Sequence, residues 1–251
     1  AASIAVAGEG RRVMRGLLVA IGFLTRIPVP AAVFDDADAR MRSLPWYPLV
    51  GWMLGGLLYL LAWAIHGWPP LLSAALTLAA WVALTGALHL DGLADSADAW
   101  VGGIGDRVRT LAIMKDPNCG PMGVTAVVLT LLLKFAALAS APAWPGVWLA
   151  PLLGRAALVA AFLFVPYVRA GGMGEGLAAS SRAVNTAVLA TVAAGCLFAG
   201  LRGAASLMVA MALFVAWRRA CLQRLGGMTG DTCGALAELT EAAVLIAAAT
   251  A

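Results

Sequence analysis

Three aspartates recur at helical spacing in residues 89–98. Asp91, Asp95 and Asp98 directly follow a long apolar run. At about 100° per residue these positions fall within an arc of roughly 60°, so one helix face carries three carboxylates. Such a face repels itself unless a cation binds to it. Mg²⁺ takes carboxylate oxygens and shares its remaining positions with water and phosphate, so the spacing predicts a magnesium site.

A second acidic pair lies near the other end of the chain. Asp231 and Glu238 share a helix face beside the small residues Gly234 and Ala235. A carboxylate inside a membrane span is costly unless it pairs, binds a cation or lines a wet cavity. Two acidic faces that converge from separate helices suit a two-metal site for phosphoryl chemistry. The candidate metal ligands are therefore Asp91, Asp95, Asp98, Asp231 and Glu238.

Basic and titratable side chains flank the three aspartates. Arg107, Arg109 and Lys115 follow them and would supply the positive groups that anionic phosphates need. His89 ends the preceding apolar run, where it is either an interfacial residue or a ligand or base. These residues extend the candidate site over the segment 89–116.

Two further basic residues lie inside apolar segments. Arg155 either contacts the substrate or pairs with Glu238 or Glu241, and both alternatives stay open. Lys134 lies near the middle of a span, so we expect it to pack or pair there.

The composition is typical of a polytopic α-helical membrane protein. Of 251 residues, 62% are hydrophobic and only 12% are charged, which is too apolar for a soluble domain. The four cysteines form no C-x-x-C pair and only two histidines are present, so we expect packing cysteines and no zinc or haem site. No small-residue cleavage site separates Arg12 from Arg26, so we expect the N-terminal segment to be retained.

The elements that must position these residues are membrane helices. Seven segments are long and apolar enough to span a bilayer: 46–66, 71–90, 121–141, 146–167, 183–201, 203–217 and 232–251. The shorter segment 16–25 predicts an interfacial or re-entrant helix, and 27–45 a loop. Gly51 and Gly55 predict a helix-packing contact. We therefore expect an all-α transmembrane bundle that forms a single domain over 1–251.

The charge distribution orients this bundle. With a cytoplasmic N-terminus, all of the 17 Lys and Arg residues except Lys134, Arg155 and Arg202 fall on the cytoplasmic side. Lys and Arg near span ends stay in the cytoplasm. We therefore expect the polar segments to form cytoplasmic catalytic loops at about 91–120, 168–182 and 218–232, of which the second includes a flexible glycine-rich stretch, 171–176.

Five sequence words also carry a family resemblance. They are Phe23–Pro30, Tyr47–Gly51, Thr85–Asp95, Ile113–Asp116, and Gly230–Ala235 with Glu238. In this order they resemble the cobalamin synthase family, also called cobalamin-5′-phosphate synthase, of integral membrane adenosylcobinamide-GDP ribazoletransferases. The resemblance extends over nearly the whole chain.

The resemblance implies a specific reaction. The family joins adenosylcobinamide-GDP to α-ribazole, or to α-ribazole 5′-phosphate, and releases GMP with Mg²⁺ as cofactor. It also implies a multi-pass protein of the bacterial cytoplasmic (inner) membrane with its active face in the cytoplasm. We expect these two substrates and the lipid bilayer as partners and no nucleic acid, and the small-residue helix faces leave a homo-oligomer open.

The same resemblance distributes roles among the residues. Catalytic roles are expected for Asp91, Asp95, Lys115 and Asp231, and ligand contacts for Arg107, Arg155, Asp116 and His89. In the implied reaction the ribose 3′-hydroxyl of α-ribazole attacks phosphorus and loses its proton. Either an aspartate or His89 accepts this proton, or the metal lowers the pKa of the hydroxyl enough that no base is needed. Asn118 replaces a common basic residue of the family, Ala99 a glycine and Ser96 a threonine. Because Ala99 adjoins Asp98, we rank Asp98 last among the three aspartate ligands.

Two other classes of protein remain as alternatives. A CDP-alcohol phosphotransferase also carries spaced aspartates after Asp-Gly, but its Arg and its later G-x3-D-x3-D are not found here. A transporter would use charges inside the spans as an ion path near the midplane. The clustering of acids at one membrane face favours the transferase.

Overall fold

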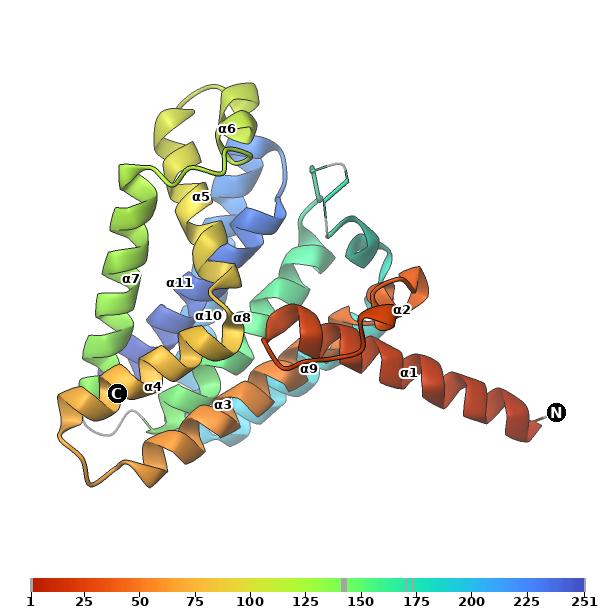
Figure 1. Ribbon diagram of the computed structural model, residues 1–251, viewed down its shortest axis with the longest axis horizontal. Helices are drawn as coiled ribbons and strands as arrows, with labels where there is room; N and C mark the ends of the chain where they lie inside the picture. Colours follow the sequence, from red (N-terminus) through yellow and green to blue (C-terminus); the bar gives the residue numbers. More distant parts are fainter. Residues whose placement is uncertain (1, 141–143, 170, 173, 251) are drawn as a thin grey trace.

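The structure is a computed structural model that describes residues 2–140, 144–169, 171–172 and 174–250. Its regular elements in these residues are helices, with one isolated bridge between Tyr167 and Met228. Three 3-10 helices, η1 to η3, span Ala31–Val33, Leu44–Trp46 and Glu175–Ala179. The α-helices (Figure 1) are α1 (Ala2–Leu24), α2 (Ala37–Met41), α3 (Tyr47–Ala64), α4 (Pro70–Thr85), α5 (Leu88–Gly102), α6 (Arg107–Ile113), α7 (Pro121–Ala139), α8 (Trp144–Phe164), α9 (Arg182–Phe198), α10 (Gly200–Leu225) and α11 (Gly230–Thr250).

The expected all-α membrane bundle is confirmed, but the count of about seven spans is not. Among the described residues, five helices are long and apolar enough to cross a membrane, or six if α4 and α5 together form one bent span. The helix α9 and the apolar part of α1, Val13–Leu24, are shorter. The short N-terminal segment is therefore part of a longer helix that extends away from the bundle (Figure 1).

The predicted single span 71–90 is wrong, because the helix breaks at Gly86 and Ala87. Both residues adopt left-handed backbone conformations, with φ of 63° and 58°, and α5 leaves the break at 88° to α4. Arg26 holds the break in place. Its backbone N–H donates to the carbonyl of Leu84 (2.7 Å), and its guanidinium packs where a side chain at position 86 would lie.

Other predicted loops are partly helical. The segment 27–45 contains η1, α2 and the start of η2, and α10 continues through 218–225, so the third loop shrinks to the turn at 226–229. The segment 91–120 contains most of α5 and all of α6. Residues 170 and 173 of the predicted second loop, and 141 and 251 at the ends of two predicted spans, lie outside the described residues.

The helix α11 is the centre of the bundle. It contacts α5, α7, α8 and α10, while α3 packs along the other side of α8. A side-chain carbon at Gly51 would lie 2.3 Å from the carbonyl oxygen of Pro151, and one at Gly55 would lie 2.7 Å from that of Trp148. The predicted packing role of Gly51 and Gly55 is confirmed, since α3 and α8 approach backbone to backbone there.

Four charged side chains neutralise one another inside the bundle. Lys134 on α7 donates to Glu238 (2.6 Å) and to Glu241 on α11, and Arg155 on α8 pairs with Glu241. Arg155 and Glu241 are 0% exposed. The Lys134 ammonium also lies 4.7 Å from the centre of the Trp81 ring on α4. This charge cluster, Lys134, Arg155, Glu238 and Glu241, joins the three helices α7, α8 and α11 and carries no net charge.

The break between α4 and α5 leads to a first prediction, for Gly86→Ala. The substitution forces an L side chain into a left-handed conformation, which costs about 1–2 kcal/mol, and its Cβ would lie 1.9 Å from Nε of Arg26. We expect a clearly lower midpoint of thermal unfolding in detergent micelles. Gly195→Ala in α9 is the control, because nothing lies within 4 Å of its added carbon. Equal midpoints for the two variants would contradict the role given to the break.

The charge cluster leads to a second prediction, for Lys134→Met. The variant leaves two carboxylates against one guanidinium, and breaking a buried pair costs roughly 3–5 kcal/mol. We expect the thermal midpoint to fall by more than for Gly86→Ala. Lys134→Met/Glu238→Gln restores zero net charge and should recover part of the loss. A double variant that is less stable than the single one would refute the pairing.

Candidate active site

The site is built where α5 crosses α11 at very short range. A side-chain carbon at Gly92 would lie 2.7 Å from the carbonyl oxygen of Asp231, and one at Gly234 would lie 3.1 Å from that of His89. Only glycine allows this approach, because any larger residue would separate the two backbones. The crossing brings the first turn of α11, with Asp231, against the first turns of α5, with Asp91 and Asp95.

A cavity of about 580 Å³ opens at this crossing. Asp91, Asp95 and Asp231 line it together, and the charges of Asp91 and Asp231 both act on the Asp95 carboxylate. In the described part of the chain, no hydrogen-bond or ion-pair partner contacts the carboxylates of Asp91 and Asp95. The cavity therefore holds two free carboxylates, besides those of Asp231 and Asp116, which also line it and are already engaged.

Basic groups stand opposite these acids. Arg169 donates through Nη1 to Oδ2 of Asp231 (2.7 Å), and Lys115 lines the same cavity as an exposed side chain. Asp116 is beside Lys115 but accepts from the backbone N–H and the side-chain amide of Asn118 (3.0 and 2.7 Å). These two hydrogen bonds lower the pKa of Asp116.

Local sequence explains how the loops deliver these groups. Thr229 precedes α11 and caps it, because its hydroxyl accepts from the N–H of Thr232 (3.2 Å) while the Thr232 hydroxyl accepts from the N–H of Thr229 (2.8 Å). Met228 pairs with the segment after α8, donating to the carbonyl of Pro166 (2.8 Å) and accepting from Val168 (2.9 Å). This pairing positions Arg169 beside Asp231.

Asp98 lies outside this cavity and holds another helix. Its carboxylate accepts from the backbone N–H groups of Gly120 (2.6 Å) and Gly123 (2.9 Å) at the N-terminus of α7. An anion is stabilised there by the unpaired N–H groups and the helix dipole. Asp98 lies on the same face of α5 as Asp91 and Asp95, but its role is structural.

Four other predicted residues are also absent from the cavity wall. Glu238 and Arg155 belong to the charge cluster, so for Arg155 the structure shows the pairing alternative. Glu238 is bonded to Lys134 and does not meet Asp231 in one site. Arg107 is exposed on α6, near the turn at Gly226, and its neighbour Arg109 is exposed as well.

His89 does line the cavity, but from a buried position at the start of α5. It is 4% exposed, and its Nδ1 has no hydrogen-bond partner among the described residues. Its backbone packs against Gly234. The geometry gives His89 a place in the wall of the cavity and leaves its ring nitrogen free.

The carboxylates of the cavity fit a Mg²⁺ ion that is bound by only one or two side chains of the protein. No group of three or more His, Cys, Asp or Glu side chains in ligand geometry is present in the described residues. Mg²⁺ sites commonly use one or two carboxylates and complete their shell with water and substrate phosphates. Asp91 and Asp95, which are free, hard oxygen donors one turn apart, suit that kind of site.

Some residues at the site were not among the predicted site residues. Arg169 and Tyr167 come from the segment after α8, and Phe23 and Tyr47 from α1 and α3. Burial raises the pKa of the Tyr167 hydroxyl. Two signals in the sequence could have pointed to them. Phe23 and Tyr47 belong to the family words quoted above, and Arg169 stands two residues before the glycine-rich segment 171–176.

Comparison with known proteins identifies the family. The family model for cobalamin-5-phosphate synthase matches residues 16–249. A relative from Stutzerimonas stutzeri, the adenosylcobinamide-GDP ribazoletransferase, is 56% identical over 93% of this chain and 97% of its own. Proteins of the same name from Pseudomonas paraeruginosa and Pseudomonas aeruginosa are each 52% identical over 95% of this chain and 99% of theirs. No solved structure matches the chain. By the match over almost its full length, the chain belongs to the cobalamin-5-phosphate synthase family.

Proposed function

We propose that the protein joins adenosylcobinamide-GDP to α-ribazole or its 5′-phosphate and releases GMP. The observation that carries the proposal is the meeting of Asp91, Asp95 and Asp231 with Lys115 and Arg169 in one cavity. Such a set can bind a diphosphate through its cations and a metal through its free carboxylates. The names of the relatives supply the two substrates.

The proposed chemistry is a displacement at phosphorus. The ribose 3′-hydroxyl oxygen forms a bond to the phosphorus nearest the cobinamide, and the bond from that phosphorus to the GMP oxygen breaks. Lys115 and Arg169 hold the diphosphate oxygens and offset the charge that GMP carries away. The hydroxyl proton passes to a carboxylate oxygen of the cavity. Positioning and electrostatics supply most of the rate in such transfers.

We propose Mg²⁺ as the cofactor, with Asp91 and Asp95 as its ligands in the protein. The metal would neutralise the diphosphate and orient it for attack. Arg169 is bonded to Oδ2 of Asp231, which lines the same cavity. We assign Asp98 and Glu238 no metal, because each carboxylate is bonded to the protein.

We also propose the cytoplasmic face of the bacterial inner membrane as the location of the site. The proposal rests on the asymmetry of Lys and Arg along the chain. Both polar loops that deliver the cavity residues, around Lys115 and Arg169, belong to the basic side in that assignment.

The direct test is turnover by purified protein in detergent or liposomes. Adenosylcobinamide-GDP, α-ribazole 5′-phosphate and Mg²⁺ should give GMP and a corrinoid with a closed nucleotide loop in equal amounts. Chelation of divalent cations by EDTA should stop GMP release, and excess Mg²⁺ should restore it. Absence of product from intact substrates would reject the activity, and full turnover in EDTA would reject the metal.

The aspartates on α5 lead to a third prediction, which separates ligands from structural groups. Asp91→Asn removes a proposed ligand and should raise the Mg²⁺ concentration for half-maximal turnover by at least about tenfold. Asp98→Asn places an amide N–H₂ against the N–H groups of α7, so it should cost about 1–2 kcal/mol of stability. Its thermal midpoint should fall while its Mg²⁺ requirement stays at the wild-type value. If Asp98→Asn instead raised the Mg²⁺ requirement and left the thermal midpoint unchanged, Asp98 would be a metal ligand.

A further inference from the structure

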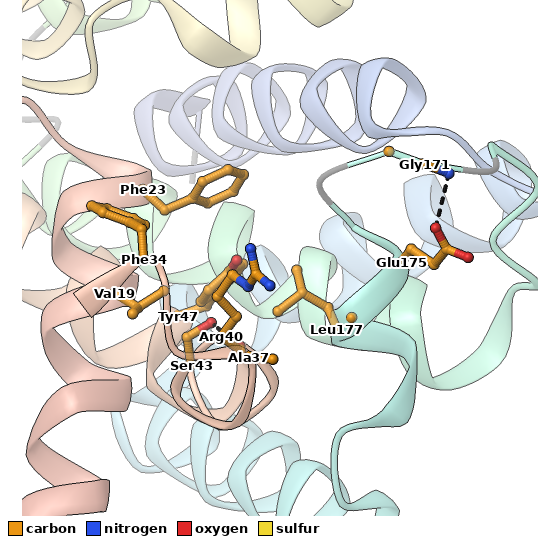
Figure 2. A pocket seen from close by; sticks show the side chains of 12 residues that line it. Val19, Phe23, Phe34, Ala37, Arg40, Ser43, Tyr47, Gly171, Glu175 and Leu177 are labelled. Carbon is orange, nitrogen blue, oxygen red and sulfur yellow. Dashed lines mark hydrogen bonds between the residues drawn. The ribbon is translucent and has the colours of Figure 1, made fainter. Parts of the chain in front are cut away.

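A second cavity of about 510 Å³ adjoins the first (Figure 2). The two cavities have a common wall, since Phe23, Tyr47 and Leu177 line both, as do the glycines at 171 and 172. The second cavity extends from this wall toward α2 and η3. A molecule bound there would lie next to the first cavity, on the other side of these shared residues.

One side of the second cavity is apolar and aromatic. Phe23 stacks on Tyr47 with ring centres 6.2 Å apart and planes 23° from parallel. Phe34 and Val19 complete this side, and Leu177 faces them across the space (Figure 2). Such walls suit a flat, weakly polar ring system, because they offer ring faces and methyl groups and few hydrogen-bonding side chains.

One cation in this region lacks a counter-ion. On and beside α2, Arg15 pairs with Asp36 and Arg42 pairs with Asp38, each at 3.0 Å. Arg40 lines the cavity and makes no ion pair with any residue that the structure describes. In Figure 2 its guanidinium projects into the space beside Tyr47. An unpaired guanidinium at the edge of a cavity is a binding group for a carboxylate or a phosphate.

The one acidic group of this cavity is held away from Arg40. Glu175 accepts from the backbone N–H of Gly171 (2.8 Å), and Figure 2 places it beyond Leu177, on the far side from Arg40. The two ends of the cavity therefore differ in charge. An anionic group of a ligand would bind at the Arg40 end and be repelled from the Glu175 end.

Resting on the proposed function, we propose that the second cavity binds the α-ribazole moiety, with its base against Phe23 and Phe34 and its 5′-phosphate at Arg40. The base is a dimethylbenzimidazole with one free ring nitrogen, which matches walls that offer few polar groups. Guanine, the base of the other substrate, would place a carbonyl, a ring N–H and an amino group against the rings of Phe23 and Phe34, which offer no hydrogen bonds. The ribose would then lie at the common wall, beside the carboxylates of the first cavity.

The fourth prediction concerns the variant Arg40→Gln, which removes the guanidinium proposed to bind the 5′-phosphate. Titration calorimetry of the purified protein should show a dissociation constant for α-ribazole 5′-phosphate that is about tenfold higher or more, because a charge-assisted hydrogen bond is lost. The constant for α-ribazole, which has no phosphate, should change less than about twofold. Arg40→Lys should recover part of the affinity for the phosphate. Arg42→Gln is the matched control, because Arg42 directly follows the same helix and is engaged by Asp38.

The outcomes separate this inference from the proposed function. If wild-type protein releases no GMP, the proposed function fails, whatever the titrations show. If it turns over and Arg40→Gln binds both forms of ribazole as the wild type does, the second cavity does not hold the phosphate and the inference fails. If Arg40→Gln instead weakens only adenosylcobinamide-GDP, the cavity holds the leaving nucleotide, and the inference fails in favour of that substrate.

Discussion

The close crossing of α5 and α11 is the constraint on which the site depends. Gly92 and Gly234 let the two backbones touch, and this contact alone sets Asp231 beside Asp91 and Asp95. The three carboxylates repel one another, so the crossing gathers charge that the protein must hold in place by packing. The packing comes from α11, which lies at the centre of the bundle with contacts to α5, α7, α8 and α10. The repulsion lowers the stability of the folded protein, but it also creates a site that attracts a cation.

The protein treats its other charges in the opposite way. Lys134, Arg155, Glu238 and Glu241 cancel one another between helices, as expected for ionisable groups far from water. Each of these four charges is engaged by an opposite charge on another helix. At the cavity, in contrast, Asp91 and Asp95 have no hydrogen-bond or ion-pair partner among the described residues. The contrast marks the cavity, and not the buried cluster, as the place for chemistry.

The sequence predicts parts of this arrangement and misses others for physical reasons. The spacing of Asp91 and Asp95 places both on one face, and the structure keeps both in the cavity. Asp98 shares that face, yet the N–H groups of 120–123 capture it, and spacing within one helix says nothing about a neighbouring helix end. Glu238 shares a face with Asp231, but seven residues at 1.5 Å each set them roughly 10 Å apart along α11. The same-face rule holds for both pairs and still does not ensure a common site.

The sequence does not reveal the break at Gly86, because the residues on both sides of it are apolar and their hydropathy predicts one continuous span. What reveals it in the structure is Arg26, which bonds to the end of α4 from the segment after α1. Phe23, one turn earlier, lines both cavities. A single stretch of chain therefore fixes the direction of the helix that carries the acids and also builds the wall shared by the two cavities. Any shift of this stretch would therefore disturb both the direction of α5, which carries Asp91 and Asp95, and the wall that the two cavities share.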